Sequence, residues 1–525
     1  MKTIRFTAFS ILFGLLVLVS ACKKENKPAA APQTGSKIMI TGQDAAAGLK
    51  STINGQTTVW VASSDIVGIY SADARTTSGG VTPIVNAPFT AAASAATSSF
   101  TGTMYWGAVS ASHTFYAYYP YTAGSAASTA VPVSLASAQT QSGANNSDHI
   151  GALDFMVATP AIVISPANTN AVANEVNLSY NHLFTILEFQ IKGTPGTQLK
   201  AVKLAGSNPV AFSGGTIDIT QSTPATGVAY NFVTQTGTTT QAVVTLTSAA
   251  TLTATNTDTK VYMVINPGTQ TGNCVIGLST DGTTWKYITK TALTGGFLRG
   301  NKYVVSVDAA AAADPVDGDG NTYATVLIGT QVWMAKNLNT TKYNDGTPIP
   351  NVTDITAWAG LTSGAYCYYN NNVGTDYGAI YGALYNWYAV DNNASTKSAS
   401  NGGENICPVG WHIPSDADWD ILNTYLGGSD VAGGKLKESG TDHWRSPNAY
   451  ATNIFGFTAL PGGCRGDSNG YFGGFGEYGY WWSSSDLTSD VPLFAWYRGL
   501  HYMLNDLMRP NRYKYYGMSV RCVKN

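Results

Sequence analysis

Six histidines and a few closely spaced carboxylates are the side chains with the greatest catalytic potential in this sequence. None of the histidines belongs to an HExxH motif or to a paired cysteine–histidine spacing, and there is no GxSxG or Walker motif. His182 and His412 lie within apolar runs, which favours hydrogen-bonded framework histidines over ligands or bases. Asp416 and Asp418 form a close carboxylate pair, but such pairs are common in a long chain. The sequence therefore predicts a non-enzyme without a metal or cofactor.

Asp317, Asp319 and Asn321 alternate like the first ligands of a calcium loop. An EF-hand needs glycine at its sixth position and glutamate at its twelfth, where this chain has Thr322 and Ile328. The pattern is more typical of a solvated turn at a domain entrance.

Two short motifs later in the chain have high rates of chance occurrence. Residues 465–467 spell Arg-Gly-Asp in a turn-rich setting, which allows an adhesive role but does not establish one. Gly474, Gly476 and Gly479 match the GxGxxG spacing of dinucleotide loops, but aromatic residues and further glycines flank them in place of a buried strand and a helix. We interpret this segment as a structural loop.

The first residues form a three-part export signal. Lys2 and Arg5 precede an apolar run over residues 6–19, which is too short for a stable transmembrane helix. Small residues then lead to Cys22, whose thiol can accept a diacylglyceryl group in the manner of a bacterial lipoprotein; an ordinary secretory signal with a chance cysteine is the alternative. We predict a signal peptide at 1–21, a flexible tether at 22–36 and a lipid-anchored outer-membrane location.

Composition divides the mature chain into two halves near residue 310. Charged residues make up only 11% of the chain and the net charge is −2, so nucleic acid is not an expected partner. Nine of the twelve tryptophans lie beyond residue 318, and an alanine-rich linker is predicted at 309–316. Five cysteines besides Cys22 leave at least one thiol without an intrachain disulfide partner.

The first half consists of short strand-like runs separated by turn residues, a pattern of all-β sandwiches. Its ordered features are Trp60 and residues 64–70, 114–121, 154–156, 178–189, 264–267 and 300–307. This series resembles the fimbrillin family, in its minor-fimbrillin-like branch, over residues 37–308. The resemblance implies two tandem transthyretin-like sandwiches in a pilus subunit or a related surface lipoprotein. It also implies partner subunits that add a strand to an exposed sheet edge.

The second half carries a denser signature, in residues 317–323, 328–338, 381–387, 407–419, 456–463, 481–485 and 519–524. It is similar to the FISUMP domain (Fibrobacter succinogenes major paralogous domain) over residues 317–525. That family distantly resembles the C-type-lectin and sulfatase-modifying-factor fold, which implies an α+β domain with long loops.

Local patterns in the second half predict two helices. Ser415 with Asp418 gives a capping signature, and Gly427-Gly428 ends the helix. Trp419, Leu422, Tyr425 and Leu426 share one face of this helix, and a second short helix is predicted to carry Tyr381, Leu384, Tyr385 and Tyr388 on one face.

The resemblance to lectin-like folds implies a disulfide between Cys407, before the capped helix, and Cys522, in the last strand-like run. Cys367 and Cys464 are open to pairing as well, which would leave Cys274 as a buried thiol. The calcium-dependent sugar motifs of lectins are not matched, since residues 504–506 and 509–511 read Leu-Asn-Asp and Arg-Pro-Asn.

In lectin-like folds the long loops after the second helix form the exposed surface, here about residues 441–512. Aromatic rings can stack on sugars or peptide side chains, while Arg and Asp supply directional hydrogen bonds. The alternative is that these rings fill the core; for the adjacent Trp481 and Trp482 we expect that at most one need be core. The candidate ligand surface is Arg465, Asp467, Tyr471, Phe475, Tyr478, Trp496 and Tyr502.

The sequence thus favours a non-catalytic, pilus-associated or adhesin-like envelope lipoprotein with a C-terminal recognition module for a glycan or protein ligand. Two alternatives remain open: a purely structural pilus or surface component, and an enzyme in the FISUMP half.

We predict that Cys22→Ser leaves the protein unprocessed or releases the mature chain into the soluble fraction, because a serine hydroxyl cannot replace the thiol that accepts the diacylglyceryl group. Membrane fractionation with mass spectrometry of the mature N-terminus measures this. Normal membrane retention of the variant would contradict acylation at this residue.

Overall fold

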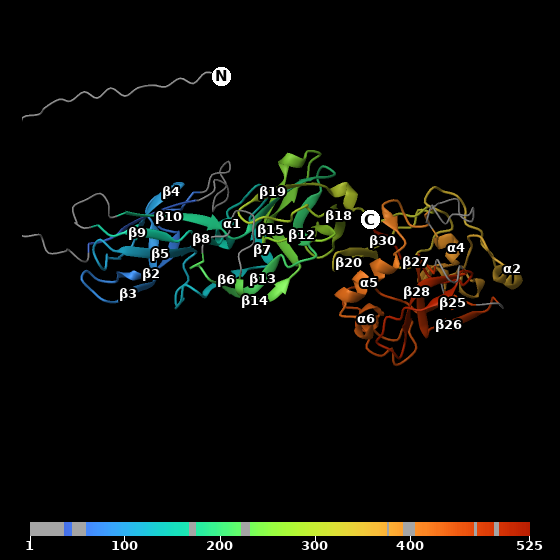
Figure 1. The fold of residues 1–525 in the computed structure, drawn as a ribbon. Helices are drawn as coiled ribbons and strands as arrows, with labels where there is room; N and C mark the ends of the chain where they lie inside the picture. Colours follow the sequence, from blue (N-terminus) through green and yellow to red (C-terminus); the bar gives the residue numbers. More distant parts are fainter. Residues whose placement is uncertain are drawn as a thin grey trace, which may run out of the picture.

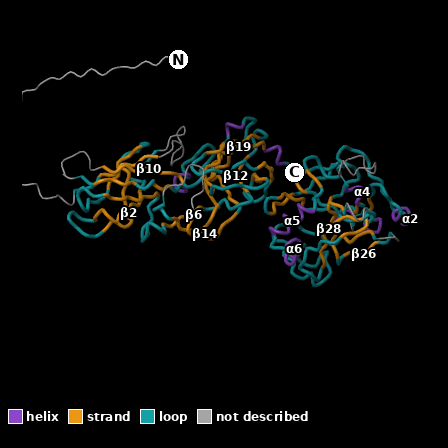
Figure 2. The backbone as a smooth tube through the Cα atoms, in the orientation of Figure 1, coloured by secondary structure: helices purple, strands orange, loops and turns teal. Residues whose placement is uncertain are grey.

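The computed structural model describes residues 36–44, 59–166, 175–221, 232–374, 377–391, 405–466, 470–487 and 493–525. The predicted signal peptide, Cys22 and Asp467 lie outside these residues. Figure 1 shows two β-rich bodies followed by the C-terminal domain, and Figure 2 shows that strands predominate in the first two. The prediction of a β-rich multidomain chain is confirmed.

The first body is an eight-stranded sheet in the order β2-β3-β4-β1-β10-β8-β5-β9, and an additional pairing of β2 with β5 closes it into a ring. Trp60 is fully buried inside this ring, with Phe100 at 4.9 Å and Tyr180 at 5.2 Å between ring centroids. The strands are β1 (Met39–Asp44), β2 (Ile66–Arg75), β3 (Pro83–Ala91), β4 (Thr97–Thr101), β5 (Ser112–Tyr119), β8 (Met156–Ala158), β9 (Ala161–Ile164) and β10 (Glu175–His182), with helix α1 (Ile150–Leu153) before β8.

The second body has three sheets, β16-β11-β19, β18-β17-β12-β15-β7 and β14-β13-β6. The first two enclose an aliphatic core, while buried residues of the third belong to a cluster that includes Tyr70 and Tyr118 of the first body. Two of its strands, β6 and β7, come from the sequence between β5 and β8 of the first body, so the two bodies are interleaved (Figure 1). The strands are β6 (Val131–Leu135), β7 (Ala138–Gln141), β11 (Thr185–Lys192), β12 (Gln198–Ala205), β13 (Ala211–Ile217), β14 (Phe232–Thr239), β15 (Gln241–Thr251), β16 (Lys260–Ile265), β17 (Asn273–Ser279), β18 (Lys286–Thr291) and β19 (Lys302–Asp308), with the 3-10 turn η1 (Asn256–Asp258) before β16.

Two glutamine side chains from β7 join two of these sheets. The amide of Gln139 donates to the carbonyl of Val264 at 2.6 Å and accepts from the Val264 N–H at 3.0 Å. Gln141 accepts from the N–H of Tyr262 at 2.8 Å and donates to the carbonyl of Lys260 at 3.1 Å. The side chains therefore satisfy backbone groups of β16 that a neighbouring strand would otherwise satisfy.

The C-terminal domain is built on small sheets with helices and long loops around them. The two larger sheets have the orders β20-β21-β30-β24 and β27-β28-β29, and β22-β23 and β25-β26 form two-stranded sheets. Its strands are β20 (Thr325–Ile328), β21 (Gln331–Met334), β22 (Tyr366–Cys367), β23 (Leu384–Tyr385), β24 (Trp411–His412), β25 (Gly462–Arg465), β26 (Phe472–Phe475), β27 (Tyr478–Asp486), β28 (Phe494–His501), β29 (Asn511–Tyr513) and β30 (Val523–Lys524). The helices are α2 (Ile355–Ala359), α3 (Gly378–Tyr381), α4 (Trp387–Val390), α5 (Asp416–Tyr425) and α6 (Ser429–Leu436), with the 3-10 turn η3 (Tyr369–Asn371).

The capped helix is confirmed, while the second predicted helix is wrong. Helix α5 begins at a full capping box in which Ser415 and Asp418 exchange hydrogen bonds. Tyr381 and Leu384 do not share a helix, because Gly382 has φ of 77° and separates α3 from β23. This left-handed backbone conformation is one that glycine adopts without strain, and it breaks the expected helix in two.

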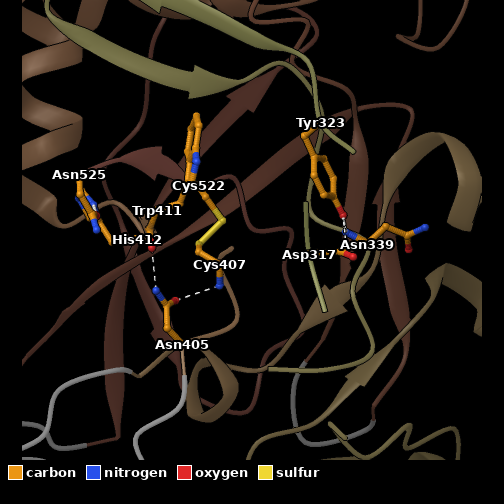
Figure 3. The surroundings of a disulfide bond; sticks show 9 residues. All are labelled: Asp317, Tyr323, Asn339, Asn405, Cys407, Trp411, His412, Cys522 and Asn525. Atoms are coloured by element: carbon orange, nitrogen blue, oxygen red, sulfur yellow. Dashed lines mark hydrogen bonds between the residues drawn. A yellow bond between two sulfur atoms is a disulfide. The ribbon is translucent and has the colours of Figure 1, made fainter. Parts of the chain in front are cut away.

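The Cys407–Cys522 disulfide is confirmed, with an S–S distance of 2.03 Å (Figure 3). It joins the loop before α5 to β30 across 115 residues, and closing such a loop stabilises a fold by about 4–5 kcal/mol in the chain-entropy model. Cys274 is a buried thiol, as expected. The pairing of Cys367 with Cys464 is wrong, since Cys367 is a buried thiol with no disulfide and a pKa that burial raises to about 12.

The second body and the C-terminal domain share a continuous core. Val275 and Tyr287 belong to the same buried cluster as Val332 and Cys522 of the C-terminal domain. The Lys524 ammonium donates to the carbonyls of Tyr287 at 2.7 Å and Ala311 at 3.0 Å, so it crosses the junction. The predicted linker contains a 3-10 turn, η2 (Ala309–Ala312), and Ala312, the last residue of this turn, is buried.

Candidate functional site

The aromatic loops of the C-terminal domain form one group of contacting rings beside the turn that connects β26 to β27. Phe475 at the end of β26 contacts Tyr369 at 4.8 Å, Tyr377 at 5.0 Å and Tyr381 at 4.8 Å between ring centroids. Phe472 closes the group through Tyr369 at 5.2 Å. Four of the five rings are partly exposed, whereas Tyr381 is buried. We call these five rings the β26 ring cluster.

A second group of rings begins on β27, after the turn. Tyr478 stacks on Tyr480 at 5.4 Å and contacts His501 at 4.4 Å, and His501 contacts Tyr502 at 4.6 Å. The turn contains Gly476, whose φ of 76° is a backbone conformation that glycine adopts without strain. The two strands belong to different sheets, since β26 pairs with β25 and β27 pairs with β28, so the two ring groups lie on either side of one turn.

Ion pairs border these rings. Arg445 pairs with Glu477 in the β26–β27 turn and lies 5.5 Å above the ring of Tyr502. The His443 Nδ1 lies 2.8 Å from a carboxylate oxygen of Glu438, and its ring contacts that of Tyr381 at 5.6 Å. The surface thus combines ring faces with charges of both signs.

The structure brings together only part of the predicted ligand surface. Phe475, Tyr478 and Tyr502 lie in the two ring groups and are partly exposed, and Tyr471 is 68% exposed just before β26. Trp496 lies five residues from His501 on β28, about 17 Å away at the usual rise of a strand. Its ring packs under the guanidinium of Arg509 at 3.8 Å.

For Arg465 the prediction of a surface role is wrong, since the side chain is 1% exposed. Its guanidinium donates to the carbonyls of Val352 at 2.7 Å, Thr353 at 2.9 Å and Asp354 at 3.1 Å, and its Nε donates to Gly470 at 3.0 Å. The guanidinium also faces the ring of Trp358 at 4.5 Å. These contacts place the side chain in the interior, where it fastens the loop before α2 to β25.

The expectation that only one of Trp481 and Trp482 need be core is also wrong. The two rings point to opposite sides of β27, and each side is covered by a separate hydrophobic core. Trp481 donates to the Asn337 side chain at 2.9 Å and Trp482 to the carbonyl of Tyr385 at 2.8 Å. The sheet is therefore buried on both faces here, with both indole N–H groups satisfied.

Burial shifts the pKa of three side chains in these ring groups. It raises the pKa of Tyr381 to about 12, and it raises the pKa of Tyr480 beyond its ordinary range. Burial also lowers the pKa of His501. The phenols of Tyr381 and Tyr480 therefore act as neutral groups, suited to stacking and directional contacts.

The acidic turn at the start of the domain is structural. The carboxylate of Asp317 accepts from the N–H groups of Asp319 and Asn321, both at 2.9 Å, and from the Tyr323 hydroxyl at 2.5 Å. Asp317 is buried, so the turn is less solvated than predicted. Within the described ranges, no group of three or more His, Cys, Asp or Glu residues could hold a metal ion.

Sequence reasoning missed Tyr369, Tyr377, Glu438 and Arg445 as members of this surface. The tyrosine-rich segment at 366–369 was the signal that could have pointed to it.

Comparison with known proteins identifies the class of chain. The sequence model of the fimbrillin-like family matches residues 51–326, and the chain belongs to that family. Residues 326–524 match the Fibrobacter succinogenes major domain. No curated protein matches the chain. Family membership supports a pilus or adhesin-like role at the cell surface. Among the residues that the structure describes, no helix is long and apolar enough to cross a membrane.

Solved structures share only a weak overall likeness. A candidate cell adhesion protein from Bacteroides uniformis is 16% identical, with a TM-score of 0.35, over 52% of this chain and 93% of its own. A fimbrial protein from Bacteroides ovatus is 11% identical, with a TM-score of 0.28, over 94% of this chain and 99% of its own. At these scores neither likeness bears on function.

We predict that Arg465→Lys lowers the free energy of unfolding by about 2–4 kcal/mol, because lysine cannot reach four carbonyls at once and leaves some of them unsatisfied. Chemical denaturation followed by tryptophan fluorescence measures the loss. The matched control is Arg445→Lys, an exposed arginine whose ion pair contributes less than about 1 kcal/mol. Equal stability of the two variants would show that Arg465 is not a structural anchor.

Proposed function

We propose that this chain is a non-catalytic, lipid-anchored surface protein whose C-terminal domain presents a recognition surface for a glycan or protein ligand. The observation that carries the proposal is the arrangement of two ring groups on either side of the β26–β27 turn. Rings such as Phe475 and Tyr478 offer apolar faces, while Arg445 and Glu477 supply directional polar contacts beside them. Membership of the fimbrillin-like family supports the cell-surface location.

The junction between the second body and the C-terminal domain supports display. The core shared by Val275, Tyr287 and Cys522 and the hydrogen bonds from Lys524 hold the recognition domain on the β-body. A rigid attachment lowers the entropy that is lost when a ligand binds. The proposed role of the fimbrillin-like region is therefore to carry the recognition domain away from the membrane.

We predict that Phe475→Ala and Tyr478→Ala each reduce binding about tenfold, as truncation of an aromatic hot spot does. Beads coated with the mature chain are applied to a glycan array and to immobilised extracellular proteins, and retained beads are counted. Tyr450→Ala, which removes an exposed ring elsewhere in the domain, is the control. Full retention by correctly folded Phe475→Ala and Tyr478→Ala variants would refute this surface as the recognition site.

A second candidate function is that of a structural pilus component, and the groove beside β19 favours it. Strand β19 pairs with β11 on one side, and an apolar cavity of about 410 Å³ opens between β19 and the edge strand β18. Leu187, Ile276 and Val304 are among the residues that line it. An unpaired edge beside an apolar groove can accept a strand from a neighbouring subunit.

A lysine in that groove tests strand addition, because a charge on an edge strand opposes pairing with another chain. Val304→Lys is expected to leave the fold intact and to reduce co-assembly with other fimbrillin-like subunits in pull-down assays. Val233→Lys, on edge strand β14, is the matched control, since the two valines are 53% and 56% exposed. Equal co-assembly by both variants would exclude the β19 groove as the strand acceptor.

A further inference from the structure

A cleft lies between the second body and helix α5. The described residues that line it include none of the aromatic residues in the two ring groups. Its volume is about 510 Å³, within the range of small-molecule sites. One wall is the turn after β12, with Ser207, and the other is formed by Thr330 and one face of α5. Clefts at domain interfaces are preferred places for ligands.

The face of α5 in this cleft is unusual for an outward helix face. Trp419 and Leu422 point into the core and are buried, as an amphipathic helix requires. Beside that buried face, Ile421 is 51% exposed and Tyr425 is 42% exposed, and both line the cleft. The prediction that Tyr425 shares the face of Trp419 and Leu422 is therefore wrong. The outward face therefore offers an aliphatic side chain and a ring side by side.

The ring of Tyr425 is held from one side. Gly329 lies against it, since a Cβ at this glycine would approach the ring to 3.0 Å, and Phe455 contacts it at 5.8 Å between centroids. Support from one side leaves the ring oriented and available for stacking by a ligand. The positive φ of Gly329, 62°, suits glycine at this close approach.

Polar groups around the ring suit a neutral polyol. Ser207, Thr330 and Thr424 bring hydroxyl groups into the lining, and Asp420 brings a carboxylate. The Arg498 guanidinium binds Oδ1 of Asp420 at 2.9 Å, while Oδ2 receives no hydrogen bond from a described residue. Among the described residues that line the cleft there is no lysine or arginine, so this lining offers no cation to an anionic ligand.

We propose that this cleft is a second binding site, which takes a neutral oligosaccharide. One sugar ring stacks on Tyr425 and packs against Ile421, and its hydroxyl groups donate to Oδ2 of Asp420. The walls belong to the second body and the C-terminal domain, which share one core, so the cleft is preformed. The site is independent of the β26–β27 rings and does not depend on their function.

Isothermal titration of the mature chain with cellotriose, maltotriose and mannotriose tests the proposal. We expect at least one trisaccharide to bind, and Tyr425→Ala and Asp420→Asn each to weaken it about tenfold. Tyr450→Ala and Phe475→Ala are the controls and are expected to leave its affinity unchanged. Asp420→Asn alters an exposed side chain, so it keeps the test valid if Tyr425→Ala unfolds.

Two results overturn the inference. One is the lack of binding by all three trisaccharides up to their solubility. The other is binding that Phe475→Ala weakens while Tyr425→Ala and Asp420→Asn leave it intact, which would assign the sugar to the aromatic loops. Trisaccharide binding that Tyr425→Ala and Asp420→Asn weaken supports the cleft, whether or not the coated beads adhere through the rings beside the β26–β27 turn.

Discussion

Buried cations that satisfy backbone carbonyls are the contacts on which the loop-rich C-terminal domain depends. Irregular backbone leaves carbonyl groups without ladder partners, and each one that is buried must find a donor. Lys437 is buried and donates to the carbonyls of Ala449 at 2.7 Å, His501 at 3.1 Å and Leu504 at 2.9 Å. Arg465 does the same for four carbonyls. Burying a charged side chain costs free energy, and charged residues make up only 11% of this chain. The cost is visible at Lys437, where burial lowers the pKa to about 8.

The same kind of contact extends to the chain's last strand. β30 lies between β21 and β24, and Cys522 just before it is tied to Cys407. Lys524 on this strand donates to carbonyls of the second body, so one strand orders the sheet, the loop before α5 and the junction. His412 of β24 lies 2.6 Å from the Asn525 side chain and 3.3 Å from Asp418 in the α5 capping box. Burial opposes protonation of His412, but these hydrogen bonds and the charge of Asp418 outweigh it, so its pKa is raised. The cleft therefore lies on a helix, α5, whose start β30 helps to position.

Sequence reasoning succeeded where a feature is local or part of a dense motif. The capping box at Ser415 and Asp418 fixes the start of α5 within one turn, and the lectin-like resemblance placed Cys407 opposite Cys522. It failed where the outcome depends on distant partners. Strand β6 lies between β5 and β8 in the chain, yet it pairs with β13 of the second body, which no local pattern indicates. Arg465 stands in an adhesive-type tripeptide, and only the carbonyls of residues 352–354 reveal its structural role.

Hydrogen bonding alone does not decide which aromatic rings lie in the interior of the C-terminal domain. Trp481 and Trp482 are buried and both find acceptors for their N–H groups, so the sheet is covered on two faces. Trp333 and Trp419 are buried as well, although their Nε1 atoms have no hydrogen-bond partner among the described residues. The two rings pack at 4.8 Å between centroids, so packing outweighs the hydrogen bonds that are not made. Phe475 has no polar group to satisfy, yet it stays partly exposed before the β26–β27 turn, where three tyrosine rings contact it. A ring held by such contacts loses little conformational freedom when a partner covers it, which suits this surface to strong contacts.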